Sequence, residues 1–124
     1  MLQVRLGYHH AQSQRIYAHV DSGSPYCLFP FDLATLVGLD PLRSPVFTDN
    51  IGGIIKGVKD TVYFHRVKLF VESDWKIEVT AGFIKKLNAS GILGRLGFFD
   101  HFKITFDHER HPPAFEIEKL ERPI

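Results

Sequence analysis

The tripeptide Asp21-Ser22-Gly23 is the pattern in this sequence best suited to chemistry. A carboxylate that follows an apolar strand at a turn can accept or donate a proton, which is the work of a general base or acid. Ser22 adds a hydroxyl next to the carboxylate, and Gly23 lets the backbone approach a carboxylate closely. Asp-Ser-Gly is also ordinary turn chemistry, so the tripeptide needs support from its surroundings.

Two later segments accompany this tripeptide. Residues 51–57 are largely apolar and include three glycines: Gly52, Gly53 and Gly57. The strand-like stretch Thr61 to Glu72 follows, and further on Ile92-Leu93-Gly94-Arg95 places two apolar residues before a glycine. Apolar runs separated by glycines favour a hairpin, which the sequence predicts over residues 50–64.

In this order, the segments resemble the retroviral-type (retropepsin-like) aspartic proteases, and most closely their single-domain bacterial and cellular members. In that family an apolar strand delivers Asp-Thr/Ser-Gly, a glycine-rich hairpin forms a flap, and two apolar residues and a glycine precede a short helix. The matching parts here are Tyr17 to Ser24, Asn50 to Phe64 and Ile92 to Arg95, and the tail Gly97 to Asp107 is also similar. The resemblance covers most of the chain. It implies an all-β fold, a closed acid-protease barrel with one short helix near the C-terminal third.

The resemblance also implies that this barrel is half of a two-fold dimer. Peptide hydrolysis of this kind uses two carboxylates that share one proton, so that one activates water while the other protonates the carbonyl oxygen. A single domain over residues 1–124 holds one Asp-Ser-Gly, so the second carboxylate would be Asp21 of an identical partner. Ser22 would bond across the dimer axis. This chemistry uses no metal and no cofactor.

The hairpin would bind the substrate, a peptide or protein. An extended chain would pair with backbone groups of the flap, as in strand addition. The expected substrate-binding residues are Gly52, Gly53, Ile54, Ile55, Gly57, Leu28 and Ile92. We therefore expect an aspartic-type endopeptidase with apolar pockets beside the scissile bond. A non-catalytic dimerisation or peptide-binding module on the same fold is the open alternative, because a fold and a motif do not guarantee turnover.

The sequence departs from the family pattern near the tripeptide. Ser24 and Pro25 follow the glycine, where alanine is usual at the first position. Pro25 also takes the place of an acidic residue that, in the retroviral branch, pairs with the arginine matching Arg95. Arg95 therefore needs another partner. His19 lies two residues before Asp21, where a small or apolar residue is usual, and we expect it on the alternate face of its strand.

Other chemistries fit less well. His108 and His111 are spaced i, i+3, but they fall in a polar turn without a cysteine partner, so exposed histidines are a better interpretation than a zinc site. The glycines of residues 52–57 lack the Gly-Lys-Ser/Thr of a phosphate-binding loop. Cys27 lies among apolar residues and is expected to be a buried core thiol. Asn88-Ala89-Ser90 has the form of a glycosylation sequon but is expected to be a turn.

Composition is that of a globular domain. The 124 residues are 44% hydrophobic and 23% charged, enough to bury a modest core. Fifteen Lys and Arg against fourteen Asp and Glu give a net charge of +1, so we expect no nucleic-acid partner and no membrane surface. The single cysteine favours a reducing compartment, and residues 1–6 alternate rather than forming a signal peptide. We therefore expect a cytoplasmic protein.

The elements that must position the site are mainly strands. Eleven Phe and many Val and Ile favour strands. Alternation of apolar and polar residues predicts strands at residues 2–6, 16–20, 61–72, 76–83, 102–106 and 115–117. A short helix is predicted over Phe31 to Gly38, and one or two helical turns over Arg95 to His101. Within residues 61–72 the alternation changes phase near His65-Arg66, which predicts a bulge.

Overall fold

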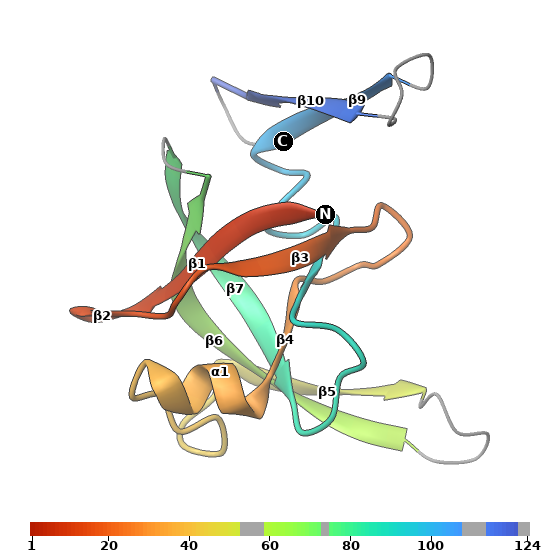
Figure 1. Cartoon of the computed structure of the whole chain (residues 1–124). Helices are drawn as coiled ribbons and strands as arrows, with labels where there is room; N and C mark the ends of the chain where they lie inside the picture. The colour runs from red at the N-terminus through yellow and green to blue at the C-terminus, as the bar shows by residue number, and fades with distance from the viewer. Residues whose placement is uncertain (53–58, 73–74, 108–113, 122–124) are drawn as a thin grey trace.

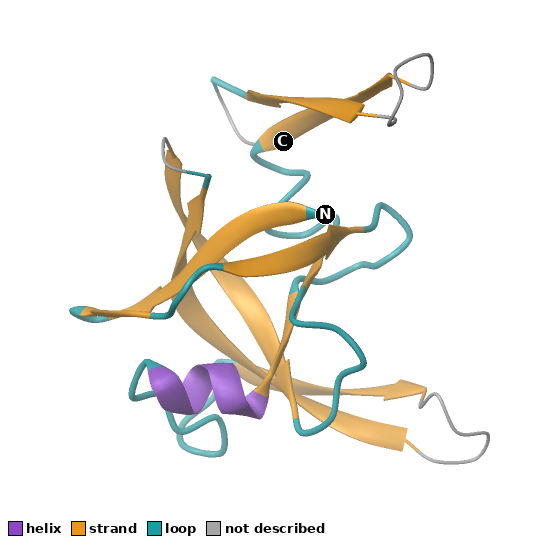
Figure 2. Ribbon diagram, viewed as in Figure 1, coloured by secondary structure: helices purple, strands orange, loops and turns teal. Residues whose placement is uncertain are grey.

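The computed structural model describes residues 1–52, 59–72, 75–107 and 114–121 of the 124-residue chain. Strands dominate these ranges, as the composition predicted (Figure 2). In chain order the strands are β1 (Leu2–Tyr8), β2 (Ala11–Gln12), β3 (Ile16–Val20), β4 (Leu28–Pro30), β5 (Phe47–Gly52), β6 (Lys59–Val71), β7 (Trp75–Ile84), β8 (Ile92–Leu93), β9 (Phe102–Asp107) and β10 (Ala114–Lys119). Within the same ranges, one α-helix, α1 (Phe31–Leu36), lies between β4 and β5.

Six of the strands close into a barrel (Figure 1). Neighbouring strands pair in the order β1, β3, β8, β4, β7 and β6, and β6 then pairs with β1, which closes the ring. β2 and β5 extend this sheet as the hairpin partners of β1 and β6. The expectation of an all-β closed barrel is therefore confirmed.

Strand β8 has only two residues, yet it joins two parts of the barrel. It runs parallel to β3, with His19 opposite Ile92, and antiparallel to β4, with Leu28 opposite Ile92. β4 then pairs in parallel with β7. Because β3 ends at Val20 and β4 begins at Leu28, the segment that contains Asp21 connects the two strands on either side of β8.

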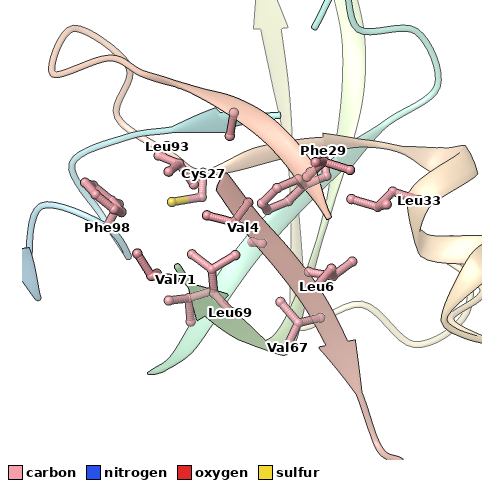
Figure 3. Close-up of a cluster of buried hydrophobic side chains, with 14 of the residues drawn as sticks. Val4, Leu6, Cys27, Phe29, Leu33, Val67, Leu69, Val71, Leu93 and Phe98 are labelled. Carbon is pink, nitrogen blue, oxygen red and sulfur yellow. The ribbon is translucent and has the colours of Figure 1, made fainter. Parts of the chain in front are cut away.

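A main cluster of buried apolar side chains fills the barrel. Figure 3 shows part of it, with Val4 of β1, Phe29 of β4, Leu69 of β6 and Phe98 gathered inside. Helix α1 packs Leu33 against this cluster. The helix predicted over Phe31 to Gly38 is confirmed, and it ends two residues before Gly38.

The predicted bulge in β6 is wrong. The register between β6 and β7 runs without interruption from Tyr63 opposite Phe83 to Val71 opposite Trp75. The change of phase instead reflects two apolar environments on opposite faces of β6. Val67, Leu69 and Val71 face the main cluster, whereas residues on the other face contribute to a small cluster made of Leu28, Val62, Phe64 and Ile84, with Tyr26, Ile51, Leu87 and Ile92 half-buried against it.

The short helix expected near the C-terminal third is also wrong. Residues 95–101 form successive turns, and Gly97 has a φ of 110°, which a right-handed helix cannot include. The Gly97 N–H donates to Asp100 Oδ2 at 3.2 Å, and a ring nitrogen of His101 lies 2.9 Å from the Gly97 carbonyl oxygen. Phe98, which is fully buried, anchors these turns in the main cluster.

Strands β9 and β10 form a second, two-stranded sheet at the top of the view in Figure 1. A sheet of two strands is marginally stable by itself. Phe102 at the start of β9 is buried in the main cluster, and Ile104 and Ile117 pack against it. This packing secures the second sheet to the barrel. In the part of the chain that the structure describes, no helix has the length and apolar character needed to cross a membrane.

Candidate functional site

The carboxylate of Asp21 stands exposed at the end of β3 in a well-braced turn. The Asp21 backbone N–H donates to the carbonyl oxygen of Leu93 on β8 at 3.0 Å, and this bond holds Asp21 next to that strand. The Gly23 N–H donates to Asp21 Oδ1 at 2.9 Å, and the Ser24 N–H donates to the Asp21 carbonyl oxygen at 3.1 Å. Ser22 and Gly23 are exposed beside it. The predicted catalytic tripeptide is thus an exposed turn whose carboxylate is oriented by its own backbone.

Gly94 lies directly beneath the segment that follows the turn. A Cβ at this position would come within 2.2 Å of the Tyr26 carbonyl oxygen and 2.6 Å of the Ser24 carbonyl oxygen, so glycine is required. Next to it, the Arg95 N–H donates to Ser24 O at 2.9 Å and the Leu96 N–H donates to Pro25 O at 3.0 Å. The two motifs that the sequence singled out, Asp-Ser-Gly and Ile-Leu-Gly-Arg, are therefore in direct contact.

The residues flagged as departures have defined places. His19 is exposed, on the face of β3 opposite the buried Ala18, as the alternation predicted. The Arg95 side chain is exposed, while its backbone N–H holds Ser24. Pro25 contributes its carbonyl oxygen to the same contact. The backbone bonds between these segments therefore brace the turn without using the Arg95 guanidinium.

The predicted apolar wall residues meet in the small cluster. Leu28 is opposite Ile92 across β4 and β8, and both contact the group formed by Val62 and Phe64 of β6. Leu28 is buried, so it packs inside the cluster and has little surface for a ligand. Ile92 is half-buried and offers apolar surface. Ile51 on β5 joins the same cluster, and sequence reasoning had not selected it.

The predicted glycine-rich hairpin is present as paired strands. β5 and β6 are antiparallel, with Asn50 opposite Thr61 and Gly52 opposite Lys59. Thr61 Oγ1 donates to Asn50 Oδ1 at 3.1 Å across the pair. The remaining residues expected to bind substrate lie outside the described ranges: Gly53, Ile54, Ile55 and Gly57. In Figure 1 the far ends of β5 and β6, the β3–β4 connection and the β7–β8 connection all lie on the right of the view.

Tyr26 connects the Asp21 turn to this hairpin, which sequence reasoning missed. Its hydroxyl donates to Asp49 Oδ2 on β5 at 3.2 Å. Its ring packs edge-on against Phe64, with 4.7 Å between ring centroids, and Phe64 in turn stacks on Phe47 of β5 at 4.2 Å. The hydrogen bond to Asp49, together with burial, raises the pKa of Tyr26. Tyr26 and Asp49 are 23 residues apart and share no periodic pattern, so the sequence carries no signal for this contact.

The alternative chemistries find little support in the described part of the chain. There, His, Cys, Asp and Glu side chains form no group of three or more that could hold a metal ion. His108 and His111 lie outside the described residues. Cys27 is fully buried, as predicted, and burial raises the pKa of its thiol to about 11, so it is protonated at neutral pH and a poor nucleophile. Gly52 belongs to a strand that is followed by another strand, which is not the strand–helix setting of a phosphate-binding loop.

Comparison of the chain with protein-family models, with curated proteins and with solved structures gives no significant match. Its function must therefore be inferred from the residues and contacts described above.

Proposed function

We propose that the protein is a homodimeric aspartic endopeptidase whose catalytic pair is formed by Asp21 of two identical subunits. The observation that carries this proposal is the exposed Asp21 carboxylate, held by the Gly23 N–H in a turn that Gly94 and Leu93 brace from below. An exposed carboxylate at the edge of a rigid barrel can meet its symmetry copy across a two-fold axis. A flexible turn could not hold two such groups in register.

The chemistry follows from placing two carboxylates a few ångströms apart. They cannot both ionise easily, so the pair shares one proton in its active form. The ionised group takes a proton from water, and the water oxygen attacks the peptide carbonyl carbon while the protonated group gives its proton to the carbonyl oxygen. Collapse of the tetrahedral intermediate breaks the C–N bond, and the nitrogen leaves with a proton returned by the pair. Ser22 is proposed to bond across the axis and hold the two turns together.

Substrate binding is proposed between the Asp21 turn and the β5–β6 hairpin. The half-buried Ile51 and Ile92 offer apolar surface to side chains beside the scissile bond. Gly52, Gly53, Ile54, Ile55 and Gly57 are proposed to cover the substrate as a flap. An extended peptide would gain main-chain hydrogen bonds from such a strand pair, as in strand addition.

The substitution Asp21→Asn tests this proposal. The amide is nearly isosteric with the protonated acid, so the variant should fold and dimerise while peptide cleavage is lost, because it cannot accept a proton from water. The matched control is Asp32→Asn, which neutralises an exposed carboxylate on α1 and should leave cleavage unchanged. Cleavage of an apolar peptide library over a pH series and sedimentation of both variants are the measurements.

Each outcome decides between the candidate functions. Full cleavage by a folded Asp21→Asn protein would end the aspartic-protease proposal. A strictly monomeric protein that still cleaves peptides would contradict the shared pair of carboxylates. An unchanged protein that binds peptides without cleaving them would favour the non-catalytic binding module.

A further inference from the structure

The outer face of strands β3, β1, β6 and β7 gathers positive charge away from the Asp21 turn. Seven charged side chains lie on these strands or directly beside them, five basic and two acidic: Arg5, Arg15, Arg66, Lys68, Lys76, Glu72 and Glu78. Asp60 lies on the same side of β6 but nearer the hairpin, and it is not part of this group. We call these seven residues the basic face. Five positive charges less two negative charges leave +3, against +1 for the whole chain. The positive charge is therefore concentrated here, and the rest of the chain is slightly acidic.

The strand register places these cations in adjacent rows. Arg5 is opposite Phe70, and Phe70 is opposite Lys76, so one row crosses β1, β6 and β7. Lys68 is opposite Gly7 and Glu78 in the next row. Phe70 separates Arg5 from Lys76, and the directly opposite pair Lys68–Glu78 is a favourable pair of unlike charges. The ion pair in these rows, Arg66 with Glu78 at 3.5 Å, is exposed at both ends and contributes little.

Two clefts hollow the basic face. One, of about 250 Å³, is lined by Arg5, Arg15 and Glu72 with Gln3 and Val4. The other, of about 190 Å³, is lined by Arg66, Lys68, Glu78, Gly7 and the Tyr8-His9 turn among others. The Phe70 ring packs over Gly7, and the Arg5 guanidinium carbon lies 5.4 Å from the centre of that ring. Each cleft thus presents two cations and one carboxylate, and in the larger of these two clefts the Phe70 ring orients Arg5.

The basic face continues from the candidate site along one side of β6. Alternate residues of a strand share a face, so Val62 and Phe64 of the small cluster point to the same side as Arg66, Lys68 and Phe70. The distance from Phe64 to Phe70 along an extended strand is about 20 Å. An extended chain bound at the small cluster would therefore need about six residues to reach Phe70, and more to reach the cleft that contains Arg5 and Arg15.

We propose that the basic face binds an acidic segment of the protein substrate, outside the segment that is cleaved. This inference rests on the proposed proteolytic function. Guanidinium groups bind carboxylates through paired hydrogen bonds, which suits the cleft that contains Arg5 and Arg15. In the other cleft the Arg66 guanidinium already contacts Thr80 and Glu78, so Lys68 is the cation left for a ligand. Single-stranded nucleic acid fits less well. Arg5 lies over the Phe70 ring, and the ring packs against Gly7, so it cannot stack on a base. A net charge of +3 is also small for a protein that contacts about six to ten phosphates.

The direct test measures binding of a fluorescent Glu- and Asp-rich peptide to the Asp21→Asn dimer, so that the result does not depend on cleavage. The triple variant Arg5→Gln, Arg15→Gln, Arg66→Gln should weaken binding roughly tenfold, because each exposed charge pair that is lost weakens binding by about twofold. The matched control neutralises three exposed lysines elsewhere, Lys86, Lys103 and Lys119, and should change the affinity less than twofold. Added salt should weaken binding to the parent protein and have less effect on the triple variant.

A second measurement separates this inference from the proposed function. Cleavage of an apolar peptide is compared with cleavage of the same peptide carrying an acidic extension. In the parent protein the extension should lower KM and so raise kcat/KM, and in the triple variant it should change neither. Acidic-peptide binding without any cleavage would leave the basic face supported and the protease proposal overturned. Three outcomes would overturn the inference. The extension could leave cleavage unchanged, or the triple variant and the lysine control could bind the acidic peptide equally well. The third outcome is that a single-stranded oligonucleotide binds more tightly than the acidic peptide.

Discussion

The two apolar clusters on either side of β6 differ in how completely they are closed. In the described ranges the main cluster has 21 buried residues, and the side chains of Leu6, Leu69 and Phe98 are wholly inaccessible to solvent. The small cluster has four buried residues and as many half-buried ones, and it borders the Asp21 turn through Ile92. A closed core stabilises a fold, whereas a half-open one keeps apolar surface available to a ligand. One strand therefore serves the scaffold with one face and the candidate site with the other.

The largest expected effect comes from removing a side chain of the main cluster. Leu69→Ala should lower the free energy of unfolding by about 4 kcal/mol, because closely packed neighbours leave a cavity. Leu28→Ala, the same truncation in the small cluster, should cost about 2 kcal/mol because half-buried neighbours can relax into the space. Urea unfolding of both variants measures the difference. Equal losses of stability would show that the two clusters are packed alike.

The pH dependence of stability gives the next largest contrast. Burial raises the pKa of Cys27 from 9.0 to about 11, so the native state holds this proton more tightly than the unfolded state. The resulting stability is fully present below pH 9 and is lost as the pH rises towards 11, by about 3 kcal/mol. Thermal unfolding between pH 8 and 11 should show a decline that is much shallower in Cys27→Ala.

Tyr26 in the small cluster provides the control for that titration. The hydrogen bond to Asp49 is the main cause that raises the pKa of Tyr26, so the native state holds this proton more tightly than the unfolded state. The protein therefore also loses stability as the pH rises above the ordinary pKa of a tyrosine. The Tyr26 side chain is more accessible, and Tyr26→Phe should change the slope less than Cys27→Ala does. A larger change in Tyr26→Phe would reverse the ranking of the two clusters.

Substitution of Gly94 should damage the turn more than the barrel. Gly94→Ala brings a Cβ against the Ser24 and Tyr26 carbonyl oxygens, and the backbone must move, at a cost of about 1–3 kcal/mol. Gly38→Ala is the control, since its φ of 78° adds about 1 kcal/mol of backbone strain while no atom lies within 4 Å. We expect amide exchange near Asp21 to accelerate in Gly94→Ala and to stay unchanged in Gly38→Ala. Unchanged exchange in both variants would contradict the bracing role of Gly94.

The smallest expected effect concerns the bond between the turn and the hairpin. Tyr26→Phe removes the hydrogen bond to Asp49 and should lower stability by about 0.5 kcal/mol. Amide exchange of Asn50 and Thr61 should nevertheless become faster, because the hairpin loses its connection to the Asp21 turn. Thr61→Val removes a bond within the hairpin and leaves the Tyr26 bond intact. If both variants accelerate exchange equally, Tyr26 has no separate role in holding the hairpin.

Sequence reasoning succeeded where side-chain periodicity reports a single buried face. Strands β1 and β3 and the first part of β7 alternate against the main cluster, and the positions of these strands were predicted closely. In β6 the same reasoning misread a change of buried face as a bulge, because periodicity does not say which cluster a residue faces. The expected turns of helix over residues 95–101 failed at Gly97, whose positive φ is set by tertiary packing.

Local sequence patterns likewise predicted only part of the candidate site. Sequence reasoning named the Asp21 turn and Gly94 as separate motifs, and the structure brings them into contact. The role of Ile51 and the Tyr26–Asp49 bond depend on how β5, paired with β6, lies beside Tyr26, and no local pattern encodes this. The pairing of two Asp21 carboxylates remains a proposal, because it concerns two chains.

The place of β8 also determines when the site can form during folding. β8 comes late in the sequence, yet it pairs with β3 and β4 near the start, and Asp21 depends on the Leu93 carbonyl oxygen for its position. Contacts between residues so far apart in sequence form slowly, because a long loop must close first. A nascent chain that has not yet emerged past residue 93 therefore lacks an ordered Asp21 turn, and an enzyme built this way would stay inactive until its barrel is complete.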